Sequence, residues 1–193
     1  MHMNNKKYLY LVVFGVKAPN ANVELHDVRW VIGSNIEETF ESLRNNWFGS
    51  IEGLHIDSYK KIQSIDGYKI NLKNKKSEKI KKNNLHSEKK KKLWFVNLGG
   101  YHENSMQEIH EFGLVVAFNS FEAKKLAKSK WLLGYSKTHK DNISCLKKVS
   151  FVDDCAVIKN IENWEIELIP GNDLNTETNS PDWFGFMRID QIV

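Results

Sequence analysis

Histidine and carboxylate residues occur in the same order at two places in the chain. Glu24-x-His26 is followed by His55-x-Asp57 at the first place. The same groups recur at the second place as Glu108, His110, His139 and Asp141. Imidazoles and carboxylates together bind zinc, manganese or iron, and a carboxylate that orients a histidine supports general acid–base catalysis near neutral pH. The sequence therefore contains two candidate sites of one chemical type.

The recurrence belongs to a longer internal repeat. Residues 8–59 align with residues 92–143 at an offset of 84 without a gap, and 12 of the 52 positions are identical. Chance for this composition gives roughly three identities. After Asp57 the best offset becomes 87, which aligns Ile65-Asp66 with Val152-Asp153. The chain is therefore interpreted as a tandem duplication.

Each copy has the pattern of two strands, a helix and a last strand. Apolar runs predict first strands at 9–14 and 93–98, with Gly15 and the pair Gly99-Gly100 predicted to end them. Second strands are predicted at 24–33 and 108–117. The last strands are placed near 68–72 and 155–158.

A helix is predicted between the second and last strands. Ile36, Phe40, Leu43 and Trp47 have the spacing of one apolar helix face. Capping boxes are predicted from two residue pairs, Ser34 with Glu37 and Asn119 with Glu122. These elements predict an α+β fold made of two ββαβ-type units related by a pseudo-two-fold axis, which share a core because half-size units bury little surface alone.

The candidate groups fall at the beginning of the second strand of each copy. Side chains of a strand alternate between its faces, so Glu24, His26, Val28, Trp30 and Ile32 share one face. We expect this face to be the apolar core face and the ionisable pair to lie at the rim of the core, where pockets open.

Composition and charge divide the chain further. Residues 73–92 contain ten lysines, two glutamates and no Phe, Tyr or Trp, so this segment alone carries a charge of +8 within a chain of net charge +4. We predict a first unit at 1–72, a lysine-rich linker at 73–92 and a second unit at 93–169. The tail at 170–193 contains Trp183-Phe184-Gly185-Phe186-Met187, which we expect to dock on the body or on a partner chain.

The chain lacks the sequence signatures of a membrane or secreted protein. No apolar run approaches the ~20 residues of a membrane span, and the run at 9–14 is too short for a signal peptide. Two cysteines ten residues apart, Cys145 and Cys155, are expected to be reduced. We therefore expect a cytoplasmic protein with no membrane partner.

Three functional interpretations remain open from the residues. The first is a small metal- or acid/base-dependent enzyme that uses the two Glu-x-His and His-x-Asp sets. Its metal-dependent form has an unidentified divalent ion as cofactor. In the second, these groups form a structural network and the protein is a non-catalytic binding or interaction module for a small molecule or protein. The third, nucleic-acid binding by the lysine segment, is not favoured because the segment has no aromatic residues for stacking.

The chain also resembles a known family. The carrying residues are Gly15, the runs Glu24-Leu25-His26-Asp27-Val28 and Leu54-His55-Ile56-Asp57-Ser58, and in the second copy Asn97-Leu98-Gly99-Gly100-Tyr101, Glu108-Ile109-His110-Glu111, His139-Lys140-Asp141 and Val152-Asp153-Asp154-Cys155. This pattern resembles the bacterial family called domain of unknown function 1543. The resemblance implies one or two copies of such a unit per chain, covers nearly everything except the lysine segment and the tail, and implies no particular reaction.

Overall fold

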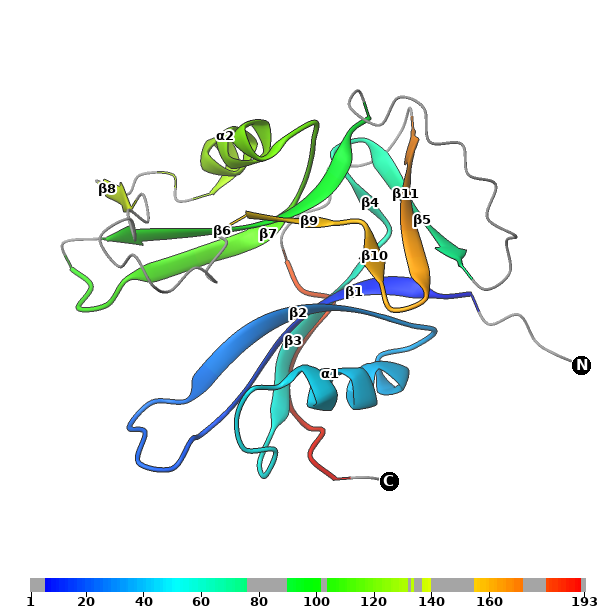
Figure 1. Ribbon diagram of the computed structural model, residues 1–193. Helices are drawn as coiled ribbons and strands as arrows, with labels where there is room; N and C mark the ends of the chain where they lie inside the picture. The colour runs from blue at the N-terminus through cyan, green and yellow to red at the C-terminus, as the bar shows by residue number, and fades with distance from the viewer. Residues whose placement is uncertain are drawn as a thin grey trace, which may run out of the picture. The chain divides into compact units, whose positions relative to one another are not determined.

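The computed structural model describes residues 6–75, 90–101, 104–131, 133, 137–139, 155–171 and 180–191. Among these residues the fold is mostly antiparallel sheet with two short helices, an α+β-like or mainly β architecture (Figure 1). The chain divides into two compact units. The first contains the described residues up to Ser64 together with 180–191, and the second contains those from Ile65 to Gly171.

The first unit is a four-stranded antiparallel sheet with strand order β12-β3-β1-β2. Its elements are β1 (Tyr8–Val16), β2 (Leu25–Gly33), the 3₁₀ turn η1 (Glu37–Thr39), α1 (Phe40–Asn46), β3 (His55–Ile62) and β12 (Trp183–Arg188). One face of the sheet packs under α1 and forms a core (Figure 1). The buried members of that core include Val12, Phe14, Val31, Leu43, Trp47 and Ile56.

The second unit repeats much of this arrangement. It contains β6 (Lys92–Tyr101), β7 (Ile109–Ala117), α2 (Ser120–Lys130), β8 (Lys137–His139) and β9 (Cys155–Ile158). The strand β6 pairs with β7 on one side and with both β8 and β9 on the other. The buried side chains under α2 include Val96, Val115, Ala123, Ala127 and Trp131.

The pairing corrects the predicted alignment of the last strands. In the second copy, Cys155–Ile158 pairs with the middle strand β6, and Ile158 lies opposite Leu93. In the first copy, the end of β3 pairs with the middle strand β1 in the same way, and Ile62 lies opposite Leu9. The expected match between 68–72 and 155–158 is therefore wrong. The offset after the histidine motif is 96 rather than 87, and the pattern missed it because residues 140–154 lengthen this connection in the second copy.

The strands that follow meet in a third sheet, of order β10-β11-β5-β4. Its members are β4 (Ser64–Ile65), β5 (Tyr68–Asn74), β10 (Asn160–Ile161) and β11 (Trp164–Pro170). The tight turns of the two hairpins match, since Asp66 and Glu162 have φ values of 50° and 51°. Asn71 and Glu167, equivalent at the offset of 96, lie opposite each other where β5 and β11 pair, so this sheet has a local pseudo-two-fold axis between them.

The two helix caps use equivalent residues of the repeat and make the same hydrogen bond. Asn119 accepts a hydrogen bond from the Glu122 N–H (2.9 Å), as predicted. In the first copy the corresponding bond joins Asn35 to the Glu38 N–H (3.0 Å), so the predicted pair Ser34 and Glu37 is wrong by one residue. The Glu38 carboxylate accepts a bond from the Ser34 N–H (2.6 Å), and the cap therefore occupies the same repeat position in both copies.

The tail is part of the first sheet. β12 pairs with β3, and backbone bonds join Asp182 N to Tyr59 O (3.0 Å) and Ile189 N to Leu54 O (2.9 Å). Ile189 is fully buried in the core. The C-terminal strand thereby covers the edge of β3, the strand that carries two of the candidate site residues.

The regular strands reach into both ends of the predicted lysine linker, because β5 extends to Asn74 and β6 begins at Lys92. Residues 76–89 lie outside the described part of the chain, as does Cys145. The described helices contain no segment that is long and apolar enough to span a membrane.

Substitution of the cap residue tests the corrected helix start. Asn35→Ala is expected to lower the free energy of unfolding by about 1 kcal/mol, because the Glu38 N–H loses its acceptor. Ser34→Ala is the matched control, since Ser34 Oγ has no hydrogen-bond partner among the described residues. Urea unfolding of both variants measures the difference. A larger loss in Ser34→Ala than in Asn35→Ala would contradict this cap.

Candidate functional site

Three neighbouring strands bring the candidate residues of the first copy together. Gly15 in the middle strand β1 lies directly opposite His26 on β2 and directly opposite His55 on β3. Glu24 immediately precedes β2, and Asp57 follows His55 on β3. Because residues opposite each other in adjacent strands project from the same face, both imidazoles lie on one side of the sheet and flank Gly15.

Position 15 requires glycine because neighbouring atoms occupy the place where a Cβ would lie. A Cβ atom at Gly15 would lie 2.4 Å from the Leu25 carbonyl oxygen and 2.7 Å from Cδ2 of His26. Both distances are shorter than atoms can approach. The missing side chain therefore lets His26 lean across the middle strand toward β3. The strands end one residue beyond the predicted stops, at Val16 after Gly15 and at Tyr101 after Gly99-Gly100.

A β-bulge aims the second carboxylate. The pairing of β1 with β3 passes from Val13 opposite Ser58 to Phe14 opposite Ile56, which leaves Asp57 as the extra residue. Bulges of this kind rotate a side chain away from the regular alternation of a strand. The strand on the other side of β3 is also irregular here, because Gly185 and Phe186 of β12 fall between its paired residues.

The four side chains converge on a small volume. Nε2 of His26 lies 3.1 Å from Asp57 Oδ2 and 3.7 Å from Glu24 Oε2. Nε2 of His55 lies 3.3 Å from Asp57 Oδ1 and 3.6 Å from Glu24 Oε2. One ligand atom each from Glu24, His26 and His55 falls within 4.8 Å of the others. The predicted set Glu24, His26, His55 and Asp57 is therefore assembled in the first copy.

The tautomer of His55 follows from its other nitrogen. Nδ1 lies 2.9 Å from the Gly53 carbonyl oxygen. A carbonyl oxygen only accepts, so Nδ1 donates and carries the proton. In the neutral imidazole, Nε2 is then unprotonated and directs its lone pair at the carboxylates of Glu24 and Asp57. Asp57 Oδ2 is buried and accepts no hydrogen bond among the described residues, although His26 Nε2 lies 3.1 Å from it.

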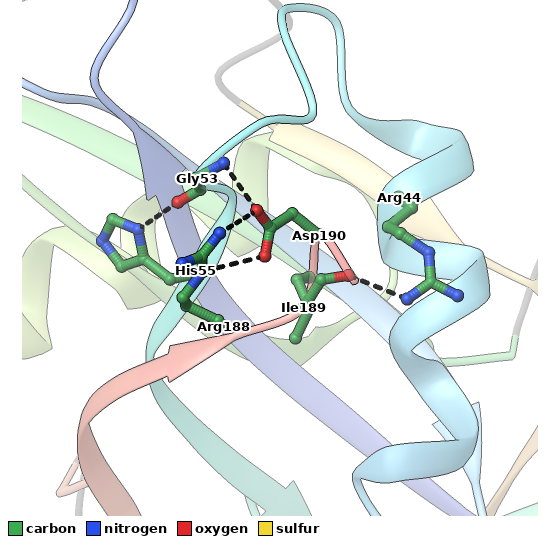
Figure 2. Close-up of polar contacts among 6 residues, drawn as sticks. All are labelled: Arg44, Gly53, His55, Arg188, Ile189 and Asp190. Carbon is green, nitrogen blue, oxygen red and sulfur yellow. Dashed lines mark hydrogen bonds and ion pairs between the residues drawn. The ribbon is translucent and has the colours of Figure 1, made fainter. Parts of the chain in front are cut away.

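Residues of the C-terminal segment bind Gly53, which in turn binds His55. The Gly53 N–H donates to Asp190 Oδ2 (2.8 Å), and Arg188 donates to both oxygens of Asp190 (3.0 and 2.6 Å), as Figure 2 shows. Arg44 of α1 donates to the Ile189 carbonyl (2.8 Å). Gly53 has φ +83° and so adopts a backbone conformation that favours glycine. The position of the Gly53 carbonyl thus depends on residues more than 130 positions away.

The ion pair between Arg188 and Asp190, which we call the Asp190 anchor, shifts the pKa of both groups. The hydrogen bonds from the Arg188 guanidinium, followed by the bond from the Gly53 N–H, hold the pKa of the Asp190 carboxyl well below its ordinary value. The same hydrogen bonds and charge raise the pKa of Arg188. Asp190 therefore stays ionised further into acid than an ordinary aspartate.

One face of the buried His55 ring is covered by Phe186, whose ring centroid lies 4.1 Å away at 33°. Phe186 itself is 65% exposed. The sequence predicts no role for Gly53, Arg188 or Asp190, and of Phe186 it predicts only that it docks with the apolar tail. The apolar tail was the only signal of their involvement, because it predicted that this segment would dock.

The site lies on the face of the sheet away from α1. The core under α1 takes Val31 from β2, which points away from the His26 side. Val28, Trp30 and Ile32, expected on the core face with His26, are only half-buried. That expectation is therefore wrong in the first copy. The side chains of Glu24, His26 and Asp57 are 41%, 44% and 30% exposed, whereas His55 is 2% exposed, so the site is open on one side.

The second copy preserves the backbone arrangement. Gly99 lies opposite both His110 and His139, as Gly15 lies opposite His26 and His55. A Cβ at Gly99 would lie 2.0 Å from Glu108 Oε1, so this glycine makes room for the carboxylate. His110 Nε2 lies 3.9 Å from Glu108 Oε2, and the Asn97 amide lies 3.3 Å from Nδ1. The His139 side chain and Asp141 lie outside the described part of the structure.

Comparison with known proteins gives the family. The model of DUF1543, Domain of Unknown Function, matches residues 21–72 and 105–158. The chain belongs to the DUF1543 family. As the resemblance predicted, it contains two tandem DUF1543 copies, and the matched ranges include all eight candidate site residues.

One solved structure is also similar to this chain, the crystal structure of a protein Il1583 from Idiomarina loihiensis. The two sequences are 30% identical, the TM-score is 0.65, and the match covers 95% of this chain and 99% of that one. No curated protein matches this DUF1543 chain.

The Asp190 anchor predicts how stability depends on pH. An unfolded Asp has a pKa of about 3.9, and the folded pKa is lower. The stabilisation is therefore present above about pH 4 and is lost as the pH falls through the folded pKa. Asp190→Asn, compared with wild type in the presence of chelator, is expected to lower the melting temperature most near pH 7 and progressively less below pH 4.

Arg188→Gln removes the main cause of the low pKa of Asp190. Its melting-temperature difference from wild type is expected to shrink below pH 4 in the same way. Melting curves from pH 7 to pH 2 measure both variants. A difference from wild type that stays constant into acid would show that the Arg188–Asp190 pair does not stabilise the fold.

Proposed function

We propose that this DUF1543 protein is a metal-dependent enzyme. Its first unit binds a divalent transition-metal ion through Glu24, His26 and His55, and the ion activates water beside Asp57. Two imidazoles and one carboxylate are the ligand set of several zinc hydrolases and non-haem iron enzymes.

The observation that carries this proposal is the direction of His55 Nε2. Its Nδ1–H is committed to the Gly53 carbonyl, so a neutral His55 directs the lone pair of Nε2 toward Glu24 and Asp57, at 3.6 and 3.3 Å. Two carboxylates around this nitrogen require a cation between them, which is either a proton on Nε2 or a metal ion. A backbone carbonyl that fixes the second nitrogen is the usual outer partner of a metal-bound histidine.

The site is also suited to catalysis rather than to structural binding. Three ligands leave part of the coordination sphere of a divalent ion for water, whereas structural zinc sites are closed by four protein ligands. A bound ion lowers the pKa of its water to about 7 in favourable sites. Asp57 has one carboxylate oxygen near each histidine Nε2, and in this proposal it accepts the proton that the water loses.

A structural network is the second candidate, because one observation favours it. His55 is buried, bonded to Gly53 and covered by Phe186, so it also ties β3 to the loop before it and to β12. In that case the histidines are protonated and pair with the carboxylates without any ion. The protein is then a non-catalytic module, and the two candidates differ in whether metal binds.

Metal binding is tested on purified, untagged protein stripped with chelator and titrated with zinc, manganese or cobalt by calorimetry. We expect His26→Ala and His55→Ala to weaken binding by at least about 100-fold at the first site. Asp27→Asn is the matched control, because Asp27 neighbours His26 on β2 and pairs with Arg29 on the other side of the strand. Its affinity should equal that of wild type.

The alternative outcome is equally definite. Wild type that binds no divalent ion above the background of a His26→Ala, His55→Ala double variant would refute the metal site. Lower melting temperatures of both single variants in chelator would then assign the groups to a structural network.

Access of water to the ion separates an enzyme from a structural metal protein. With manganese bound, we expect enhanced longitudinal relaxation of the solvent water protons, because at least one exchanging water completes the coordination sphere. The enhancement should disappear in His26→Ala. Stoichiometric manganese without relaxation enhancement would indicate a closed site and would remove the catalytic part of the proposal.

A further inference from the structure

The second unit contains a cavity of about 540 Å³ that is separate from the histidine–carboxylate groups. Its walls come from β5, β11, the beginning of β6 and the turn after β9. All the residues that line it belong to this one unit. Its volume lies within the range of pockets that hold small-molecule ligands, roughly 300–1,000 Å³.

The cavity has an excess of positive charge. It is lined by two glutamates, Glu165 and Glu167, and by five lysines, Lys73, Lys90, Lys91, Lys92 and Lys159. Glu167 is already neutralised, because Lys73 Nζ lies 2.8 Å from its Oε1 and Asn71 donates to its Oε2 (2.8 Å). The Lys73 hydrogen bond, ahead of that from Asn71, lowers the pKa of Glu167 and keeps it paired as an anion.

Two of the other cations have no such compensation. Lys92 and Lys159 form no salt bridge with any residue within the described ranges, and both contribute to the wall of the cavity. Like charges gathered around a concave surface raise the local potential, and the focused field attracts a counter-ion of opposite sign. Lysine ammonium groups bind phosphate as compact point charges.

The remaining wall is apolar and aromatic. Lys91 Nζ lies 5.2 Å from the ring centroid of Tyr68 and 5.5 Å from that of Phe118. Leu93 and Ile158 are buried beside the lysines. An occupant of this cavity would therefore meet a cationic side and an apolar side, which suits a compact organic molecule that carries phosphate.

We propose that this cavity is a binding site for a phosphorylated small molecule of nucleotide size. Lys92 and Lys159 bind the phosphate groups, and the apolar wall around Tyr68, Phe118 and Ile158 contacts the organic part. The site lies entirely in the second unit, and it does not depend on metal binding in the first.

The test titrates the full-length protein with inorganic pyrophosphate and with ADP in low-salt buffer containing chelator, by calorimetry and by amide chemical shifts. We expect ADP to bind more tightly than pyrophosphate, with shift changes at Lys92, Leu93, Ile158 and Lys159. The double variant Lys92→Glu, Lys159→Glu should weaken the binding of ADP at least about ten-fold, since two attractive charges become repulsive. Lys69→Glu is the matched control, because Lys69 is exposed on β5 and does not line the cavity.

Each other outcome overturns the proposal. No binding of either probe, or equal weakening by Lys69→Glu and by the cavity variant, would leave only general surface charge. Binding of a single-stranded oligonucleotide without any ADP or pyrophosphate binding would assign the lysines to nucleic acid. If the double glutamate variant does not fold by circular dichroism, Lys92→Gln with Lys159→Gln replaces it, and unchanged ADP affinity in that variant would also refute the site.

Discussion

The absence of a side chain at Gly15 controls the geometry of the first site. The outer strands on either side of a middle strand are roughly 10 Å apart, too far for two imidazoles to share an ion unless one leans inward. A Cβ at Gly15 would lie 2.7 Å from the His26 ring, so only glycine leaves the path across β1 open. The same backbone register surrounds Gly99 in the second copy. The repeated glycine is thus best explained by the groups on either side of it, and not by the end of a strand.

The second constraint is that His55 is held from outside its own copy of the repeat. Its Nδ1 bonds to Gly53, the Gly53 N–H bonds to Asp190, and Arg188 fixes Asp190 (Figure 2). The strand β12, which carries Phe186 and Arg188, pairs with β3 at the edge of the sheet. The first site is therefore completed by the C-terminal tail, which lies outside both family-model matches. Among the described residues, this contribution distinguishes the two copies, because no further strand pairs with β8.

The sequence predicted the duplication and the family because identical residues recur at a fixed spacing. It did not predict the strand order around the histidines. It also predicted that Glu24, His26, His55 and Asp57 would gather, although it placed them at the rim of the wrong face. The alternation of β2 could not decide which face α1 covers, since both faces contain apolar residues. The bulge at Asp57 and the carbonyl of Gly53 were not predictable either, because they depend on backbone geometry and on a strand from the far end of the chain.

The pairing of Asn71 with Glu167 shows why the last strands were misaligned. These residues are equivalent at an offset of 96, and the longer connection before β9 hides this from a comparison at 84 or 87. Strands of this sheet also line the lysine cavity, whose residues come from five separate stretches of sequence. The charge of residues 73–92 therefore predicts a single linker, although Lys73 and Lys92 belong to strands of the folded unit.

In the proposed site, Nε2 of His26 and Nε2 of His55 share one metal ion. X-ray diffraction from crystals grown with zinc, with data collected on both sides of the zinc absorption edge, tests this most directly. We expect an anomalous peak about 2.0–2.1 Å from both Nε2 atoms and in contact with a Glu24 oxygen. A well-ordered site with zinc in the medium, no anomalous peak there, and both histidines still pointing at Asp57 would contradict it.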